Sequence, residues 1–161
     1  GGFASSTRGI IAGGYNLGDV RNTIEYVTIG STGNATDFGD LTVARQYVGG
    51  LASATRGVTS AGELSNGNTS DVMDYITIGS TGNATDFGDL TAATKNTAGA
   101  ASATRGIRAG GTNTNGSGST RTIDYITIAS VGNAQDFGDL SSSNNNDNLS
   151  GAASSTPSSQ P

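Results

Sequence analysis

The sequence contains no cysteine, histidine or tryptophan, and only two of its 161 residues are proline. Without cysteine and histidine, disulfide bonds, thiolate or imidazole zinc sites and catalysis by a cysteine nucleophile or a histidine base are excluded. Leucine, glutamate, lysine and glutamine, which favour helices, are also scarce. These absences remove several classes of enzyme and argue against a helical fold.

Charge is also sparse, because 8 basic and 13 acidic residues give a net charge of −5. Eight scattered cations in an acidic chain do not provide the basic surface that nucleic acids require. No apolar run approaches the ~20 residues that a membrane-spanning helix needs. We therefore expect neither a nucleic-acid partner nor a membrane span.

Small residues dominate what is present. Glycine, serine, threonine, alanine and asparagine supply 101 of the 161 residues, whereas leucine, isoleucine, valine and phenylalanine supply 28. So low an apolar share is found in disordered chains, but those also carry a high net charge, which this chain lacks. The composition instead favours closely packed β-structure.

Internal repetition is the strongest signal in the sequence. The segment GSTGNATDFGDLT at residues 30–42 recurs unchanged at 79–91 and returns as ASVGNAQDFGDLS at 129–141. The triplet Thr-Arg-Gly precedes each copy at a similar spacing, so the unit is about 49 residues long. We expect repeats at about residues 1–46, 47–95 and 96–140, an Asn/Ser-rich connector at 141–150, and a partial fourth repeat with a tail at 151–161.

Each repeat predicts four short strands and no helix. The segments TIEYVTI, VMDYITI and TIDYITI alternate branched or aromatic residues with polar ones, which is the period of a strand with unlike faces. A glycine pair is expected to end the strand before this segment, and the Asp-Phe-Gly-Asp-Leu after it to form an outer strand. Four-stranded units must stack to cover their apolar faces, and radial stacking of four to eight gives a propeller. Three units do not close a ring, so we expect a larger or multi-chain assembly.

The repeat resembles the kelch repeat of β-propellers. Gly13-Gly14 and Gly110-Gly111 match the glycine pair of that family, although the second copy has Gly62-Glu63. Its third-strand tyrosine corresponds to Tyr26, Tyr75 and Tyr125, and Phe38, Phe87 and Phe137 stand where the family has tryptophan. The segment Thr42–Arg45 resembles the Pro-Arg that opens the next blade, and only the first copy has this arginine. The resemblance implies an all-β, kelch-like propeller.

The sequence motif IDYITIAS-x-GNA-x-DFGDL is similar to kelch-like tandem repeats of structural and tail-associated proteins in marine tailed bacteriophages. This resemblance spans residues 2–140. It implies a non-enzymatic virion structural or tail-fibre module for adhesion and host recognition, located on the virion surface or outside the cell. Its implied partners are other copies or segments of the same protein, other virion proteins and a host surface glycan.

Pairs of aspartates recur in every repeat, with two residues between the partners. Carboxylates near turn carbonyls suit Ca²⁺, which takes six to eight oxygen ligands. We expect no cofactor and favour aspartates that cap turns, while a calcium-stiffened scaffold and a carbohydrate depolymerase that uses the pairs are the alternatives. The candidate metal residues are Asp37, Asp40, Asp86, Asp89, Asp136 and Asp139.

An arginine also recurs, as Arg8, Arg56 and Arg105. A ring of these guanidinium groups could line a channel and bind anions. We favour an arginine that ties adjacent blades through carbonyl groups or an aspartate, because residues repeated in every unit mostly serve the interface between units.

The repeats diverge in the connection between their second and third strands, at residues 15–22, 63–70 and 112–121. Loops on a rigid β-scaffold commonly carry binding residues. Aromatic, amide and guanidinium groups here suit sugar hydroxyls, although neutral drift explains the variation equally well. The candidate ligand-binding residues are Tyr15, Asn16, Arg21, Asn66, Asn68, Asn113, Asn115 and Arg121.

Overall fold

A computed structural model describes residues 1–113 and 118–141, and this part of the chain is built from strands without a helix. Within it no helix is long and apolar enough to cross a membrane. The strands are β1 (Gly2–Ala4), β2 (Arg8–Asn16), β3 (Asp19–Thr28), β4 (Thr36–Asp40), β5 (Gly49–Ala52), β6 (Arg56–Ser60), β7 (Ser70–Thr77), β8 (Thr85–Thr94), β9 (Ala98–Ala101), β10 (Arg105–Ala109), β11 (Thr122–Thr127) and β12 (Gln135–Asp139).

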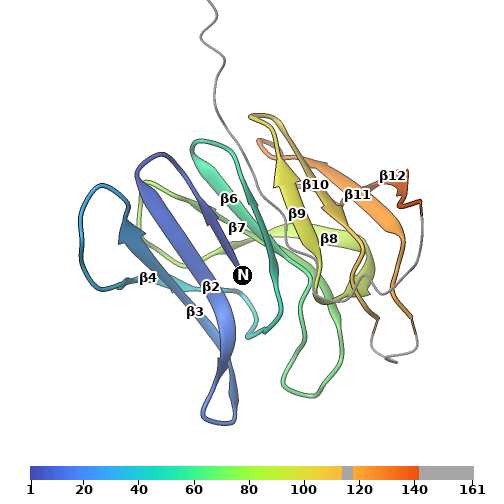
Figure 1. Cartoon of the computed structure of the whole chain (residues 1–161), viewed down its shortest axis with the longest axis horizontal. Helices are drawn as coiled ribbons and strands as arrows, with labels where there is room; N and C mark the ends of the chain where they lie inside the picture. Colours follow the sequence, from blue (N-terminus) through green and yellow to red (C-terminus); the bar gives the residue numbers. More distant parts are fainter. Residues whose placement is uncertain (114–117, 142–161) are drawn as a thin grey trace, which may run out of the picture.

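The strands form three four-stranded antiparallel sheets, each made of four consecutive strands. We call β1–β4 the first sheet, β5–β8 the second and β9–β12 the third (Figure 1). The all-β class and the four strands in each repeat are therefore confirmed. The described residues do not close a ring, so the propeller stays a prediction. Apart from Ser141, the predicted connector and partial fourth repeat lie outside the described residues.

One predicted strand end is wrong. In the first repeat β2 runs past the glycine pair to Asn16, because Tyr15 and Asn16 pair with Val20 and Asp19 of β3 after a register shift at the glycines. The third repeat follows the prediction, since β10 ends at Ala109, directly before its glycine pair. The first repeat therefore carries the longest paired hairpin.

The sheets stack face to face in chain order. Ile10, Ile24 and Phe38 of the first sheet pack against Ile76 and Ile78 of the second. These side chains are buried, so the first two repeats share one hydrophobic core. Phe38, the aromatic residue of the outer strand, thus fills the space between the two sheets.

The opposite face of the second sheet forms an equivalent core with the third. Here Val58, Met73 and Phe87 occupy the positions of Ile10, Ile24 and Phe38, and they pack against Ile126 and Ile128. The second sheet is therefore covered on both faces. Among the described residues, the first and third sheets are each covered on one face.

The first strands of the three sheets, β1, β5 and β9, lie side by side in chain order at close spacing, and glycine permits this. A Cβ atom on Gly50 would lie 2.5 Å from the carbonyl oxygen of Gly2, and one on Gly99 would lie 2.4 Å from that of Gly50. Real Cβ atoms do not approach backbone so closely. The small residues at the start of each repeat therefore set the spacing of the sheets.

Candidate functional site

A buried ion pair lies at the boundary between the first and second sheets. Arg45, in the linker that leads to β5, pairs through Nη2 with the carboxylate of Asp74 on β7. Its Nη1 donates to the carbonyl oxygen of Ala61, at 2.9 Å, and to that of Val72. The hydroxyl of Thr42 donates to the second carboxylate oxygen of Asp74. Charge and hydrogen-bonding capacity are thus largely matched inside the protein.

The boundary between the second and third sheets holds the same arrangement, with the arginine taken from a different place. Arg108 on β10 pairs with Asp124 on β11, and its Nη1 donates to the carbonyl oxygen of Gly110 at 3.0 Å. Thr91 donates to Asp124 as Thr42 does to Asp74. Each of these two sites therefore holds one guanidinium, one carboxylate and one threonine hydroxyl.

The exchange of position is reciprocal. In the second repeat Thr94 stands where the first has Arg45, and Thr59 stands where the third has Arg108. Thr59 and Thr94 are both buried, and the hydroxyl of each lacks a hydrogen-bond partner among the described residues. The guanidinium therefore pairs with the equivalent aspartate in both sites, although it comes from the linker in one and from the second strand in the other.

Burial dominates the electrostatics of these arginines. It lowers the pKa of Arg45, and the charge of Asp74 and the hydrogen bond to it act in the opposite direction. The pKa of Arg108 is lowered for the same reason, with Asp124 as the opposing group. The Nη atoms of each guanidinium bond a carboxylate and carbonyl groups, whereas the buried Nε of Arg45 and of Arg108 has no hydrogen-bond partner among the described residues, so these pairs act as ties between elements.

The arginine that recurs in every repeat makes a second kind of tie. Arg8 stacks over the ring of Tyr26, with Cζ 4.5 Å from the centroid, and donates to the carbonyl oxygen of Ile78 in the second sheet, at 2.8 Å. Arg56 repeats both contacts, with Tyr75 and with Ile128 in the third sheet. The tie through carbonyl groups is therefore confirmed for Arg8 and Arg56.

The outer strands make a third tie, with the turn of the next repeat. Gly82 and Ala84 donate from their backbones to the carbonyl oxygens of Phe38 and Asp40, and the side chain of Asn83 accepts from the backbone N–H of Asp40 at 3.1 Å. The turn at Gly132–Ala134 meets β8 in the same way, including Asn133 and Asp89. The GNA sequence is therefore a docking element between repeats.

Equivalent residues differ in exposure wherever no next sheet covers them in the described part of the chain. Phe38 and Phe87 are each 2% exposed, whereas Phe137 is 53% exposed. On the opposite faces Ile78 and Ile128 are each 1% exposed, whereas Ile29 is 54% exposed. The first sheet thus exposes one side of the contact that is buried between neighbouring sheets, and the third sheet exposes the other side.

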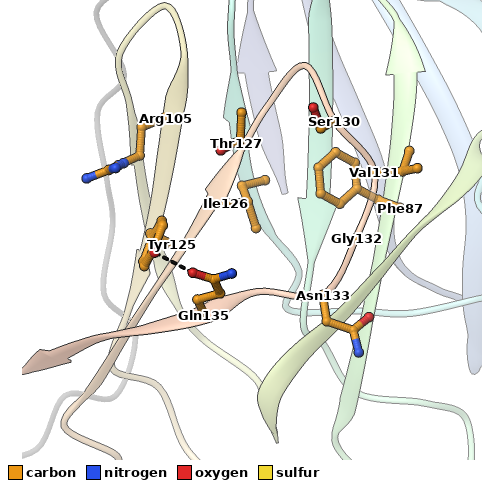
Figure 2. Close-up of a pocket in the computed structure, with 10 residues that line it drawn as sticks. All are labelled: Phe87, Arg105, Tyr125, Ile126, Thr127, Ser130, Val131, Gly132, Asn133 and Gln135. Carbon is orange, nitrogen blue, oxygen red and sulfur yellow. Dashed lines mark hydrogen bonds between the residues drawn. The ribbon is translucent and has the colours of Figure 1, made fainter.

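A pocket of about 340 Å³ opens on the third sheet. Figure 2 shows Arg105 above Tyr125, whose hydroxyl donates to Gln135, with Asn133 and Gly132 on the opposite side. Arg105 stacks on Tyr125 as Arg56 does on Tyr75, but it has no carbonyl partner in a following sheet among the described residues. The pocket lies where the third sheet meets the second, because Phe87 of β8 also lines it.

The predicted metal residues do not form a cluster. They lie on the outer strands β4, β8 and β12, and the described residues hold no group of three or more acidic side chains placed to bind a metal ion. Asp40 and Asp89 contribute backbone N–H groups to the contact between repeats, and those groups are capped by Asn83 and Asn133. The capping residue in this contact is thus an asparagine of the next repeat.

The described predicted binding residues lie in or beside the connections between the second and third strands of the repeats, and the β2–β3 and β6–β7 connections emerge at the bottom of Figure 1. Tyr15, Asn16 and Arg21 line one groove on the first sheet. Asn66 and Asn68 share a turn, where the side chain of Asn66 accepts from the backbone of Asn68. Asn113 is exposed, and Asn115 lies outside the described residues.

Arg121 has a structural contact, because its Nε donates to the carbonyl oxygen of Leu140 at 2.7 Å. The site residues Asp74, Arg108 and Asp124 were not predicted from the sequence, and Arg45 was predicted only as part of the kelch pattern. The reciprocal threonine–arginine exchange in the repeats was the available signal. Neither a protein-family model nor a curated protein matches the sequence.

Proposed function

We propose that the chain is a non-enzymatic structural and adhesion module of a virion surface, in which a rigid stack of kelch-like sheets presents variable connections to a glycan. The buried polar residues support this role, since the two pairs Arg45–Asp74 and Arg108–Asp124 hold sheets and strands together. The virion setting rests on the resemblance to phage repeats.

The observation that carries the proposal is the separation of constant and variable parts. The GNA turn and the arginine at positions 8, 56 and 105 are repeated from unit to unit, whereas the β2–β3, β6–β7 and β10–β11 connections differ in sequence. The β2–β3 and β6–β7 connections emerge at one end (Figure 1). Tyr15 is 60% exposed in the longest of the paired hairpins. An exposed ring beside amide groups suits stacking on sugars and bonding to hydroxyls.

Binding of this kind is weak at one site and strong in an array. Modules repeated on a particle raise the effective concentration of the remaining sites once one is engaged. The full propeller that we propose would add further sheets, from this polypeptide or from other copies, and further connections at the same end.

The test is binding of the full chain, displayed on beads, to a panel of bacterial surface glycans. Tyr15→Ser and Asn68→Ala should lower the retained signal about tenfold or more, because each removes a contact of the presented end. The control variants Thr32→Ala and Thr81→Ala change exposed turn residues outside these connections and should bind normally. Equal loss in all four variants, or release of reducing sugar from the glycan by the wild-type chain, would contradict the proposal.

A further inference from the structure

A groove of about 380 Å³ lies on the uncovered face of the first sheet, and Gly13, Thr23 and Glu25 are among its lining residues. These three residues correspond in the repeat to Ala61, Val72 and Asp74. In the second sheet those are the residues that hold the guanidinium of Arg45. The groove therefore carries the acceptors of an arginine site.

The backbone at the groove has the same conformation as at the Arg45–Asp74 and Arg108–Asp124 sites, which we call the two filled sites. Gly13 has φ 62°, and its counterparts Ala61 and Gly110 have φ 63° and 65°. In the second and third sheets the carbonyl of this residue accepts from an arginine Nη1, at 2.9 and 3.0 Å. Because this conformation is unusual for alanine, its retention at Ala61 indicates that the carbonyl has a role.

The first repeat does not supply an arginine of its own to this groove. Ile11 stands at the position of Arg108, and Glu25 makes no ion pair among the described residues. Arg21 also lines the groove, but it is exposed and forms no ion pair with Glu25. The only position left for the missing guanidinium, by the logic of the two filled sites, is the linker of a preceding repeat.

We propose that this groove is a socket for an arginine side chain, carried on the linker of another repeat unit that packs against the first sheet. The occupant enters as Arg45 enters the second sheet, and it pairs with Glu25 and the carbonyl oxygens of Gly13 and Thr23. A planar guanidinium can bond a carboxylate and two carbonyls at once, which an ammonium on a flexible stem does less well.

Other residues of the uncovered face correspond to residues that contact the neighbouring repeat at the inner boundaries. Ile29 is exposed where Ile78 and Ile128 are buried, and its carbonyl stands where those of Ile78 and Ile128 accept from Arg8 and Arg56. Asn34 stands where Asn83 and Asn133 accept from the preceding outer strand. Covering this face without an arginine would bury the Glu25 carboxylate unpaired, which is strongly unfavourable.

The chain itself offers the probe. Duplicating residues 1–48 in front of Gly1 recreates the junction between Val48 and Gly49, since Gly1 pairs with Ala12 as Gly49 pairs with Ser60. The linker of the added copy then carries its Arg45 to the original first sheet. We expect amide exchange in the original β2 and β3 to slow about tenfold or more relative to the 161-residue chain.

Arginine dependence is tested by Arg45→Thr in the added copy alone, which should lower the melting temperature by about 4 °C or more and restore fast exchange in the original β2 and β3. Ile11→Arg in the original copy should then recover both values, because it recreates the Thr94/Arg108 arrangement. Arg45→Thr in the original copy alone, at a site already seen to be filled, gives the reference size of the effect.

A second measurement uses the 161-residue chain. Ile11→Arg should raise its melting temperature by filling the socket from within, and Glu25→Gln should remove that gain. The proposal is wrong if the added repeat leaves exchange in β2 and β3 unchanged, or if the effect of its arginine is absent. It is equally wrong if Glu25→Gln leaves the gain from Ile11→Arg intact. These outcomes are independent of glycan binding.

Discussion

At the scale of single residues, the protein places a buried guanidinium at each inner sheet boundary and takes it from either of two positions. A linker arginine, Arg45, pairs with Asp74, and a second-strand arginine, Arg108, pairs with the equivalent carboxylate of the next repeat, Asp124. Burying a charge costs free energy, and removing one member of such a pair would leave the other charge buried and unpaired. The threonine at the alternative position is tolerated although its hydroxyl is unpaired.

This equivalence predicts a rescue. Arg45→Thr should destabilise the chain by about 3–5 kcal/mol, because Asp74 is left buried without a counter-ion. Adding Thr59→Arg should restore most of that loss, since residue 59 is the counterpart of Arg108. Urea unfolding followed by circular dichroism measures both steps.

The control for this rescue is Thr59→Arg alone. It forces a second guanidinium toward a carboxylate that is already paired with Arg45, and it should be destabilising. If the double variant is as unstable as Arg45→Thr alone, residues 45 and 59 do not serve one site.

At the scale of whole elements, the outer strand and the turn of the next repeat form a tight backbone contact that depends on glycine. A Cβ atom on Gly39 would lie 2.5 Å from the carbonyl oxygen of Gly82, and one on Gly88 would lie 2.6 Å from the carbonyl carbon of Gly132. Gly138 has a similar φ but nothing within 4 Å of its Cβ position.

Alanine substitutions at these glycines should therefore differ in cost. Gly39→Ala, Gly88→Ala and Gly138→Ala share the strain of φ 144°, 131° and 137°. Only the first two also push the next sheet away, which we expect to cost about 1–3 kcal/mol more. Thermal unfolding of the three variants isolates the packing contribution, and equal losses would show that the contact between repeats is loose.

The repeated arginine offers a second comparison between elements. Arg56 and Arg105 both stack on a tyrosine, but only Arg56 also donates to a carbonyl of the following sheet, at 3.0 Å. Arg56→Ala should thus cost about 1 kcal/mol more than Arg105→Ala, a modest difference because the group is partly solvent-exposed. Chemical denaturation of the two variants side by side measures this difference, and a larger loss from Arg105→Ala would oppose it.

At the scale of the whole molecule, coverage is uneven. The second sheet is packed on both faces, whereas the described part of the chain leaves one face of the first and of the third sheet open, with Ile29 and Phe137 half exposed. Hydrogen exchange followed by mass spectrometry should find β6 and β7 the most protected strands, with β2, β3, β10 and β11 opening earlier. Uniform protection across the three sheets would indicate that the uncovered faces are covered in solution.

Calcium gives a further test at this scale. Because the described residues contain no acidic cluster suited to a metal ion, a chelator should leave the melting temperature unchanged. A decrease with EDTA that excess Ca²⁺ reverses would instead support the calcium-stiffened scaffold. Calcium-saturated EDTA serves as the control for effects of the chelator itself.

The sequence by itself determined the repeat, its four strands and the identity of the residues that fill the space between sheets. Tyr26, Phe38 and their counterparts recur at constant spacing, and local alternation is enough to place them on strands. The turn sequence GNA was also visible, although its role as a docking element was not.

Only the tertiary structure decided which of these residues are buried and which charges meet. Phe87 and Phe137 stand in the same local sequence, Asp-Phe-Gly-Asp-Leu, yet one is covered by the next sheet and the other is not. Arg45 and Asp74 lie 29 positions apart and belong to different repeats, so no local pattern connects them. Arg108 and Asp124 lie 16 apart and meet because β10 and β11 pair in one register. Burial and the Arg45–Asp74 pair depend on neighbours in space that a repeat acquires only when another sheet stacks against it.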